Sequence, residues 1–190
     1  MTDSKSTLII ERAKTTLALS DFYCGIPLMD SFIHNGLQEL VVANQDLYVV
    51  KDQDNHTVAF FCLEQGSYFI GEEVKEKILK EMKPSPKPGL EEDSIFWDLS
   101  NHPSVELSYF AVDRNYQNRN IGKTIIDSLI GRLSTSAEYT QPVLTVRALQ
   151  TEDGSYSAVD FYKKCGFTLG EDYKPNKNLL LYKAIPRSDS

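Results

Sequence analysis

Short runs of β-branched and aromatic residues alternate with helical patterns along this chain. Residues 7–13 predict a strand, and the runs 46–50 and 57–63 predict two more, joined as a hairpin through the polar segment between them. Between the first and second strands, Pro27 is placed to open a helix. The apolar face of that helix would consist of Met29, Phe32, Ile33, Leu37 and Leu40.

Residues 71–101 have a different character. A charged helix beginning near residue 72 sets Val74, Ile78 and Met82 four apart on one apolar stripe. The proline-rich segment 83–89 that follows cannot continue a helix. We therefore expect an insertion or lid within one domain that spans residues 1–190.

The second half of the chain has the clearest patterns. The run 104–112 is apolar on much of both faces, as expected of a central strand. The predicted order is strand 104–112, helix 121–133, strand 142–149, helix 158–165 ending at Gly166, and strand 178–185. This succession of strands and helices predicts a mixed α/β (α+β) fold.

The composition narrows the class of protein. A chain of 190 residues with 41% hydrophobic and 25% charged residues fits one globular domain. No apolar run is long enough for a signal peptide or a membrane span, so we expect a cytoplasmic protein without membrane contact. Cys24, Cys62 and Cys165 lie far apart, which predicts reduced thiols and neither disulfides nor a zinc site. The net charge of −7 disfavours nucleic acid and favours a basic or amine-bearing partner.

The segment "VDRNYQNRNIGK", residues 112–123, joins the central strand to a helix. The start of a helix presents unpaired backbone N–H groups and the positive end of the helix dipole, which together bind phosphate. Arg114, Arg119 and Lys123 add positive charge. The segment matches neither the P-loop nor the dinucleotide-binding glycine pattern, so it predicts a different phosphate ligand.

Three segments together resemble the GNAT (Gcn5-related N-acetyltransferase) superfamily. "QNRNIG", residues 117–122, is similar to its pyrophosphate loop Q/R-x-x-G-x-G/A, and "AVDFYKKCGF", residues 158–167, is similar to its later A-x-x-F-Y-x-K-x-G-F segment. "FYCGIPLMDSFI", residues 22–33, resembles a bacterial branch that includes toxins acetylating aminoacyl-tRNA. Asn120 stands where the family usually has glycine, and asparagine tolerates left-handed backbone angles, so we expect the loop to form.

The resemblance implies a GNAT-type fold and acetyl-CoA as the cofactor. The fold would be a mixed, mostly antiparallel central sheet flanked by helices, with a helical insertion before the central strand. The cofactor would lie between the strand ending near Val112 and the strand 142–149. By the resemblance, the cofactor-binding residues are Phe110, Ala111, Val112, Gln117, Asn118, Arg119, Asn120, Ile121, Gly122, Lys123, Ser155 and Lys164.

Two residues are candidates for the chemistry. The resemblance makes Tyr162 the general acid, although the pattern alone fits a core aromatic equally well. Glu106, eleven residues before Gln117, resembles the glutamate base of the histone-acetylating branch; its alternative is a structural strand glutamate. A base matters most for lysine, because an amine with a pKa of about 10.4 costs about 4.6 kcal/mol to neutralise at about pH 7, against about 1 kcal/mol for an α-amine.

Other reactive residue types fit structural roles. Cys165 is expected in the core, because direct transfer needs no covalent intermediate. His34, His56 and His102 show no ligand spacing, so no metal site is expected. The segment before the central strand, with Glu91, Glu92, Asp93, Ile95, Phe96 and Trp97, is expected either to border the acceptor site or to be a surface excursion.

The sequence therefore predicts an N-acetyltransferase that transfers acetyl from acetyl-CoA directly to a primary amine of a small molecule or peptide. One alternative is a toxin-like enzyme acting on aminoacyl-tRNA, which the acidic composition disfavours without excluding it. Another is a non-catalytic CoA-binding module, favoured by Asn120 and by Ser155, which stands where many family members have asparagine. A monomer or homodimer is expected.

Overall fold

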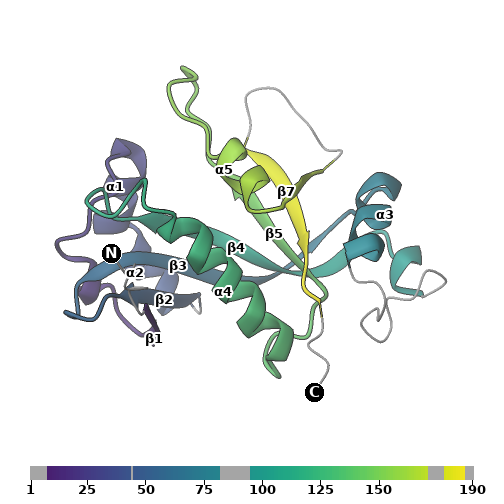
Figure 1. Ribbon diagram of the computed structural model, residues 1–190, viewed down its shortest axis with the longest axis horizontal. Helices are drawn as coiled ribbons and strands as arrows, with labels where there is room; N and C mark the ends of the chain where they lie inside the picture. The colour runs from purple at the N-terminus through teal and green to yellow at the C-terminus, as the bar shows by residue number, and fades with distance from the viewer. Residues whose placement is uncertain (1–7, 44, 82–94, 171–177, 187–190) are drawn as a thin grey trace, which may run out of the picture. The chain divides into compact units, whose positions relative to one another are not determined.

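The computed structural model describes residues 8–43, 45–81, 95–170 and 178–186 (Figure 1). Its strands are β1 Ile9–Ala13, β2 Asp46–Lys51, β3 Thr57–Tyr68, β4 His102–Val112, β5 Val143–Ala148, β6 Thr168–Leu169 and β7 Leu179–Ala184. Its helices are η1 Leu17–Leu19, α1 Pro27–Asn35, α2 Leu37–Val42, α3 Glu72–Glu81, η2 Ile95–Asp98, α4 Ile121–Thr135 and α5 Val159–Lys164. Among these, only the short strand β6 and the 3-10 turns were not predicted from the sequence.

The strands form a seven-stranded sheet in the order β1-β2-β3-β4-β5-β7-β6. The pairs β1–β2, β2–β3, β5–β7 and β6–β7 are antiparallel, whereas β4 and β5 run parallel. This arrangement confirms the predicted mixed, mostly antiparallel sheet, and it confirms β4 as the central strand. Among the described residues, no helix has both the length and the apolar character needed to cross a membrane.

Contacts between residues divide the chain into two compact units, each described here by itself. The first consists of Met1–Glu64 and Ser108–Gly122, and the second of Gln65–Leu107 and Lys123–Ser190. The strands β3 and β4 and the helix α4 each run from one unit into the other.

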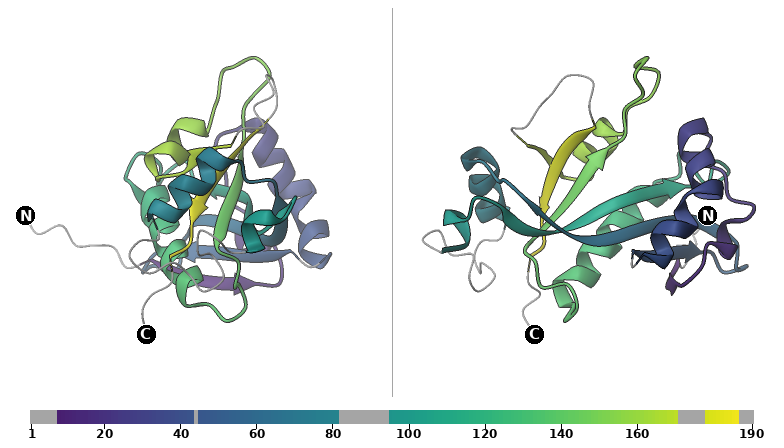
Figure 2. Two further views of the ribbon diagram at one scale, coloured as in Figure 1. Left: turned by 90° about the vertical axis from the view of Figure 1, so that its right-hand side faces the viewer. Right: turned by 180° about the vertical axis from the view of Figure 1, so that it is seen from behind.

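In the first unit, the helices α1 and α2 pack against the antiparallel strands β1 to β3 (Figures 1 and 2). The core between them is made of aliphatic and aromatic side chains, principally Phe22, Ile33, Leu37, Leu47, Val49 and Phe60. Apart from Phe22, these residues come from the predicted helix that begins at Pro27 and from the predicted strands 46–50 and 57–63.

One prediction about this unit was wrong. A single helix was expected to run from Pro27 beyond Leu37, but the chain forms α1 and α2 with Gly36 between them. Gly36 has backbone angles of φ −123° and ψ −30°, outside the helical range. Its N–H still bonds the Phe32 carbonyl at 2.8 Å, which completes the last turn of α1. Glycine loses more backbone freedom in a helix than other residues do, so the break falls at this position.

In the second unit, α3 packs against β7 and β5 (Figure 2, left). Val74 and Ile78 of α3 are buried as predicted, together with Ile70, Val143, Leu180, Tyr182 and Ala184. The third residue of the predicted stripe, Met82, lies outside the described residues, as do the proline-rich segment 83–89 and the acidic residues 91–93. Of the apolar residues in helical spacing along α4, Ile125, Ile126, Leu129 and Leu133 are buried, whereas Ile121 and Ile130 are half-buried.

Candidate active site

The loop between β4 and α4 is anchored at its start by Asp113. The carboxylate of this buried residue accepts the backbone N–H of Asn115 at 2.9 Å and that of Tyr23 at 3.3 Å. The backbone N–H of Arg114 in turn donates to the Tyr23 carbonyl at 2.9 Å. These bonds attach the loop to the chain segment that precedes α1.

Gln117 strengthens the same attachment. Its side-chain amide donates to the carbonyl of Cys24 at 2.8 Å and to the carbonyl of Val112 at 2.9 Å. The side chain of this predicted cofactor-binding residue therefore shapes the loop, which leaves its backbone as the group that could contact a ligand.

The segment that receives Gln117 is itself shaped by Asp30 and Gly25. Asp30 accepts the N–H of Cys24 at 2.7 Å and that of Gly25 at 3.1 Å. Gly25 has φ +84°, a left-handed angle that favours glycine. The C-G-x-P-x-x-D pattern in the sequence is thus a turn that holds the loop between β4 and α4 from one side.

Two asparagines give the loop its backbone shape. Asn118 has φ 60° and Asn120 has φ 57°, whereas Arg119 between them is not among the residues with positive φ. Alternating left-handed and ordinary backbone angles turn successive N–H groups toward one side, which is the geometry of an anion-binding nest. The expectation that asparagine at position 120 permits the loop is confirmed, and Asn118 plays the same part without having been singled out for it.

The helix α4 begins at Ile121, directly after this loop. The first N–H groups of a helix have no partner within it, and the helix dipole places partial positive charge at the same end. The exposed Arg119 lies with its guanidinium 5.7 Å from the centroid of the Tyr116 ring. The loop and helix start therefore combine backbone donors with a nearby cation, and this donor set suits a diphosphate.

The positive charge of Lys123, which was expected to favour an anion, is paired with a neighbouring carboxylate. Its Nζ atom forms an ion pair with Asp127, one turn further along α4, at 2.6 Å. The hydrogen bond to Asp127 raises the pKa of this lysine. Its side chain is half exposed, so the pair is open to competition from a bound phosphate.

The parallel pairing of β4 with β5 is short. The register joins Val105, Glu106 and Leu107 to Leu144, Thr145 and Val146. β4 continues beyond this ladder to Val112, and β5 continues to Ala148. The predicted cofactor-binding residues Phe110, Ala111 and Val112 all lie in the part of β4 beyond the ladder.

Glu106 is buried and held by two residues that were not predicted. The hydroxyl of Tyr68 donates a hydrogen bond to its Oε2 atom. The Nε atom of Arg147, on β5, lies 3.8 Å from its Oε1 atom. The guanidinium of Arg147 also lies 5.1 Å from the centroid of the Tyr68 ring. An arginine within the otherwise apolar run 142–149 was the available signal for this cluster.

Tyr162 is almost fully buried in α5, with 5% of its surface exposed. Its ring packs edge-on against Phe161 and Phe167, with centroid distances of 5.1 and 5.4 Å. Burial raises the pKa of the phenol, and the nearby Tyr156 and Cys165 add to this effect. The hydroxyl therefore keeps its proton across the ordinary pH range.

Three other residues singled out in this region have simple environments. Ser155 is exposed, and its hydroxyl donates to Asp153 at 2.8 Å within a turn. Lys164 is exposed at the end of α5. Cys165 is buried as predicted, and burial raises the pKa of its thiol, which argues against a nucleophile. All three cysteines are free and buried.

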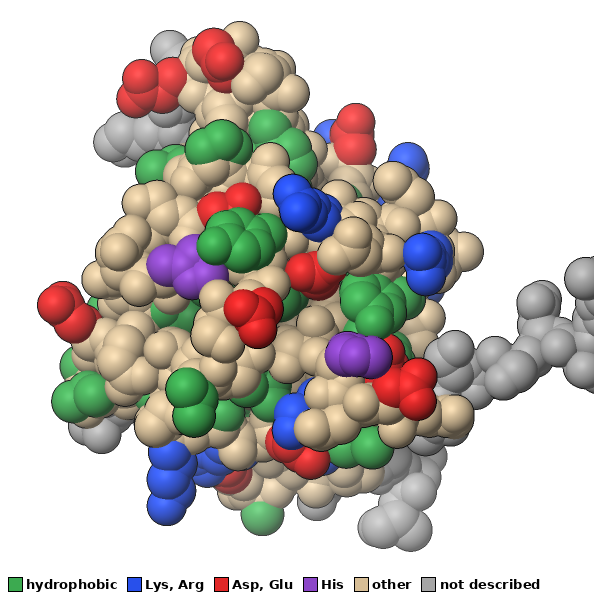
Figure 3. All heavy atoms as spheres, turned by 90° about the vertical axis from the view of Figure 1, so that its left-hand side faces the viewer, with side chains coloured by type: hydrophobic (Ala, Val, Ile, Leu, Met, Phe, Trp, Pro, Cys, Tyr) green, Lys and Arg blue, Asp and Glu red, His purple; other side chains and the backbone are tan. Residues whose placement is uncertain are grey.

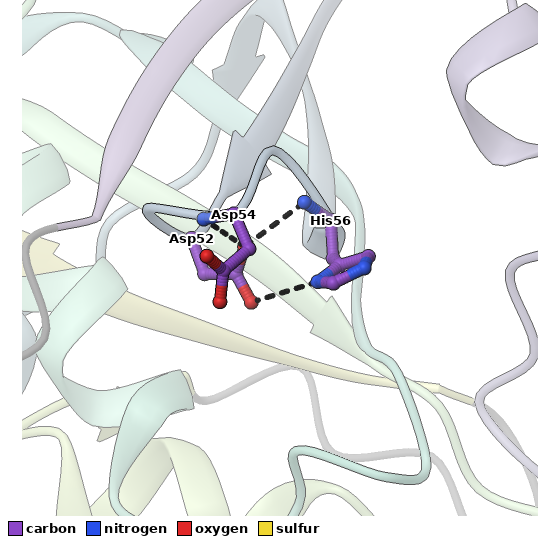
Figure 4. A group of neighbouring side chains, drawn as sticks. All are labelled: Asp52, Asp54 and His56. Atoms are coloured by element: carbon purple, nitrogen blue, oxygen red, sulfur yellow. Dashed lines mark hydrogen bonds and ion pairs between the residues drawn. The ribbon is translucent and has the colours of Figure 1, made fainter.

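Asp52, Asp54 and His56 come together in the turn between β2 and β3 (Figure 4). Their ligand atoms lie within 4.8 Å of one another. Asp52 accepts the backbone N–H groups of Asp54 and His56 at 3.0 and 2.9 Å, and it accepts the hydroxyl of Tyr116 at 2.9 Å. These bonds account for the grouping as a turn closed by an aspartate side chain.

Comparisons with known proteins agree with these features. A family model described as "Acetyltransferase (GNAT) domain" matches residues 91–169. No curated protein sequence matches the chain. Solved structures similar in fold include AtaT complexed with acetyl-methionyl-tRNAfMet, at 22% identity, TM-score 0.62, 94% of this chain and 95% of that one.

Two further solved structures are similar over nearly the whole chain. AtaTR bound with AcCoA has 22% identity and a TM-score of 0.63, covering 94% of each chain. A tyrosine-to-phenylalanine mutant of KacT has 20% identity and a TM-score of 0.63, covering 94% of this chain and 95% of that one. At these identities the likeness establishes a shared fold.

Proposed function

Residues 91–169 are a GNAT acetyltransferase domain, and from this premise we propose that the protein is an N-acetyltransferase that uses acetyl-CoA and a primary amine. The observation that carries the proposal is the loop after β4. Its left-handed Asn118 and Asn120 lead directly into the start of α4, where backbone donors suit a diphosphate.

Acetyl-CoA supplies an acetyl group activated as a thioester. In this chain, the backbone N–H groups from Asn118 to Lys123 would hold its diphosphate, with Arg119 as the nearby cation. Each hydrogen bond to a charged oxygen contributes about 1.5–3 kcal/mol, so several such donors bind a diphosphate without a metal ion. Gln117 keeps the loop in place through its bonds to Cys24 and Val112.

Other candidate contacts extend this site. The backbone of Phe110 and Val112, with Ala111 between them, is proposed to bond the pantetheine arm, because these residues lie on β4 beyond its ladder with β5. Ser155 and Lys164 remain proposed cofactor contacts on the family resemblance, and the exposure of both side chains is compatible with that role.

Direct transfer requires one bond to form and one to break. The amine nitrogen bonds to the acetyl carbon, the carbon–sulfur bond breaks, the amine loses a proton, and the sulfur gains one. Tyr162 is the proposed proton donor to the sulfur. The phenol is in the protonated form that an acid requires, and burial, by raising its pKa, makes it a weaker proton donor than an exposed tyrosine.

Glu106 is the proposed base for an amine that is protonated in solution. Its carboxylate is buried at the middle residue of the β4–β5 ladder, and Tyr68 and Arg147 hold it in place. Two oxygens with defined partners make an oriented acceptor for one proton. This role matters most for lysine-like acceptors, whose deprotonation costs about 4.6 kcal/mol at about pH 7.

The test is acetyl-CoA-dependent release of free thiol in the presence of lysine peptides, polyamines, small amines and aminoacyl-tRNA. We expect Tyr162→Phe to reduce turnover by roughly 10²–10⁴-fold, as for loss of a general acid, and to leave acetyl-CoA affinity nearly unchanged. Tyr139→Phe, which alters another buried tyrosine, is the matched control.

Each alternative outcome has a clear meaning. Unchanged turnover in Tyr162→Phe would remove this residue from the acid role. Binding of acetyl-CoA without thiol release by any acceptor would favour a non-catalytic CoA-binding module instead.

A second candidate function is acetylation of the α-amine of aminoacyl-tRNA. Fold likeness to AtaT complexed with acetyl-methionyl-tRNAfMet over 94% of this chain favours it. An α-amine has a pKa of about 7.7–8.0, so it needs little help from a base. The net charge of −7 opposes it, and the basic side chains on the face in Figure 3 are separated from one another. In the thiol-release assay, this function predicts that aminoacyl-tRNA is the preferred acceptor.

A further inference from the structure

Arg147 differs from the rest of its strand. β5 is buried along its length except at this residue, whose side chain is 49% exposed. It directly follows Val146, the last residue of β5 in the ladder with β4. Arg147 therefore stands where the proposed cofactor-binding part of the β4–β5 pair begins.

The position of its guanidinium is set by two neighbours. Tyr68 lies beneath it, with 5.1 Å between the guanidinium carbon and the ring centroid. Glu106, with only 10% of its side chain exposed, faces the Nε atom at 3.8 Å. The Tyr68 ring and the Glu106 carboxylate both restrict the Arg147 side chain. Arg147 would therefore lose less rotational freedom when a ligand binds.

This geometry is not that of an arginine that merely neutralises a buried glutamate. A dedicated arginine–carboxylate pair is commonly bidentate, with two hydrogen bonds of about 2.7–2.9 Å. The observed 3.8 Å is too long for a hydrogen bond, and Glu106 takes its hydrogen bond from Tyr68 instead. The terminal nitrogens of Arg147 are thus not committed to Glu106.

Gly66 shows that the local chain accommodates this arrangement. A Cβ atom at this position would lie 2.8 Å from Cε2 of Tyr68 and 3.1 Å from the hydroxyl of Ser104. The Tyr68 ring therefore occupies space that any other residue at position 66 would fill. Absence of a side chain there lets the ring lie against the Arg147 guanidinium while its hydroxyl reaches Glu106.

We propose that Arg147, supported by Tyr68 and Glu106, binds an anionic group of the acceptor, either a carboxylate or a phosphate, close to the amine that is acetylated. The planar fork of a guanidinium matches both anions. In a chain with a net charge of −7, an anionic acceptor needs such a local cation. This proposal rests on the proposed acetyltransferase function and specifies its acceptor.

The experiment compares acceptors in matched pairs that differ in the anion. Phosphoethanolamine against ethanolamine tests phosphate, and an α-amino acid against its amide tests carboxylate. The measured quantity is the ratio of kcat/KM for the member that carries the anionic group to kcat/KM for the member that lacks it, obtained from thiol release. We expect the wild type to prefer the anionic member of at least one pair, and Arg147→Gln to lower that preference roughly 10- to 100-fold, as for loss of hydrogen bonds to a charged group.

Further variants test whether the preference depends on the planar guanidinium or only on its charge, and whether each variant is folded. Arg147→Lys keeps the charge but loses the planar fork, so it should restore only part of the preference. Gly66→Ala should lower the preference by displacing the Tyr68 ring. Lys77→Gln, which removes an exposed cation from α3, should leave the ratio unchanged. Thermal melting of each variant checks that it is folded.

Equal ratios in the wild type and in folded Arg147→Gln would overturn the proposal, as would a wild-type preference for the members that lack the anionic group in both pairs. If no amine at all releases thiol, the acetyltransferase function fails separately. Titration of phosphoethanolamine and of the amino acid then decides the Arg147 site, because weaker binding to Arg147→Gln than to the wild type supports it and equal binding overturns it.

Discussion

His102 is a buried polar side chain with an unusual setting. Only 2% of its surface is exposed, and its ring lies 5.0 Å from that of Phe96 and 5.8 Å from that of Trp97. Its Nδ1 atom lies 3.2 Å from the backbone N–H of Ile70, whereas Nε2 has no hydrogen-bond partner among the described residues. Burial is the main cause that lowers the pKa of this histidine; the Trp97 backbone raises it, and the charge of Lys75 lowers it by the least.

This shift predicts a pH dependence of stability. His102 stays neutral in the folded state at pH values where it binds a proton in the unfolded state, so protonation favours unfolding. Its contribution to stability is present above the ordinary pKa of 6.5 and is lost as the pH falls below it toward the folded value. Denaturant unfolding at a series of pH values from neutral to mildly acidic should show a decrease that is smaller in His102→Gln.

The exposed His56 serves as the control for this measurement, because its replacement by glutamine should leave the pH dependence of His102 in place. If His102→Gln and the wild type lose stability equally with falling pH, the histidine is not the group responsible.

At the scale of elements, α3 shows how the segment between β3 and β4 is attached. The helix has acidic residues in its first turn and Lys80 in its last, an arrangement favourable to its dipole. Its exposed Glu73 and Lys77 form an ion pair at 2.9 Å, which contributes little in water. Attachment therefore depends on Val74 and Ile78, which are buried against β5 and β7.

Ile78→Ala should destabilise the protein by about 2–5 kcal/mol, because it removes buried methyl groups and leaves a cavity. Ile78 is 3% exposed in the wild type. Lys77→Ala on the neighbouring exposed position should cost less than about 1 kcal/mol. Denaturant unfolding gives both free energies, and a loss at Ile78 no larger than that at Lys77 would show that α3 is not packed as described.

Of the segment that was expected to border the acceptor site, residues 91–97, the structure describes residues 95–97. Phe96 and Trp97 lie in η2 and pack against the cluster around α3. Their packing, which leaves both rings partly buried, fits the alternative of a surface excursion, whereas their position beside the acceptor stays a prediction.

At the scale of the whole molecule, a ligand that binds only the folded chain must stabilise it. Acetyl-CoA should raise Tm in proportion to the logarithm of its concentration, with about 2.7 kcal/mol of stabilisation at about 100 times Kd. Acetylpantetheine, which lacks the diphosphate, should give a much smaller shift at equal concentration, because the loop before α4 would have no anion to bind.

Thermal unfolding with both compounds measures this difference. No shift with acetyl-CoA at about millimolar concentration would contradict the proposed cofactor site, since cofactors at useful affinity stabilise well below that level. Equal Tm shifts with both compounds would instead mean that the loop before α4 does not contribute to binding through the diphosphate.

Much of this molecule was determined by local sequence. An apolar run on much of both faces predicted β4 as a central strand, and helical spacing predicted α4 and its buried face, because side-chain direction follows the period of the element. The loop was also readable from sequence, since the left-handed angle of Asn120 is a property of asparagine itself. Gly36 also stands in the sequence, but the prediction of one continuous helix from Pro27 did not take into account that glycine disfavours a helix.

Only the tertiary structure decided how Glu106 is held. Tyr68 and Arg147 lie far from it in sequence and meet it through the arrangement of β3, β4 and β5. A shift of one residue in the pairing of two strands moves every side chain to the opposite face, and nothing in the local pattern of one strand specifies its partner's register. The sequence alone therefore determined most of the elements and the backbone shape of the loop before α4, while strand pairing determined which carboxylate, phenol and guanidinium stand together.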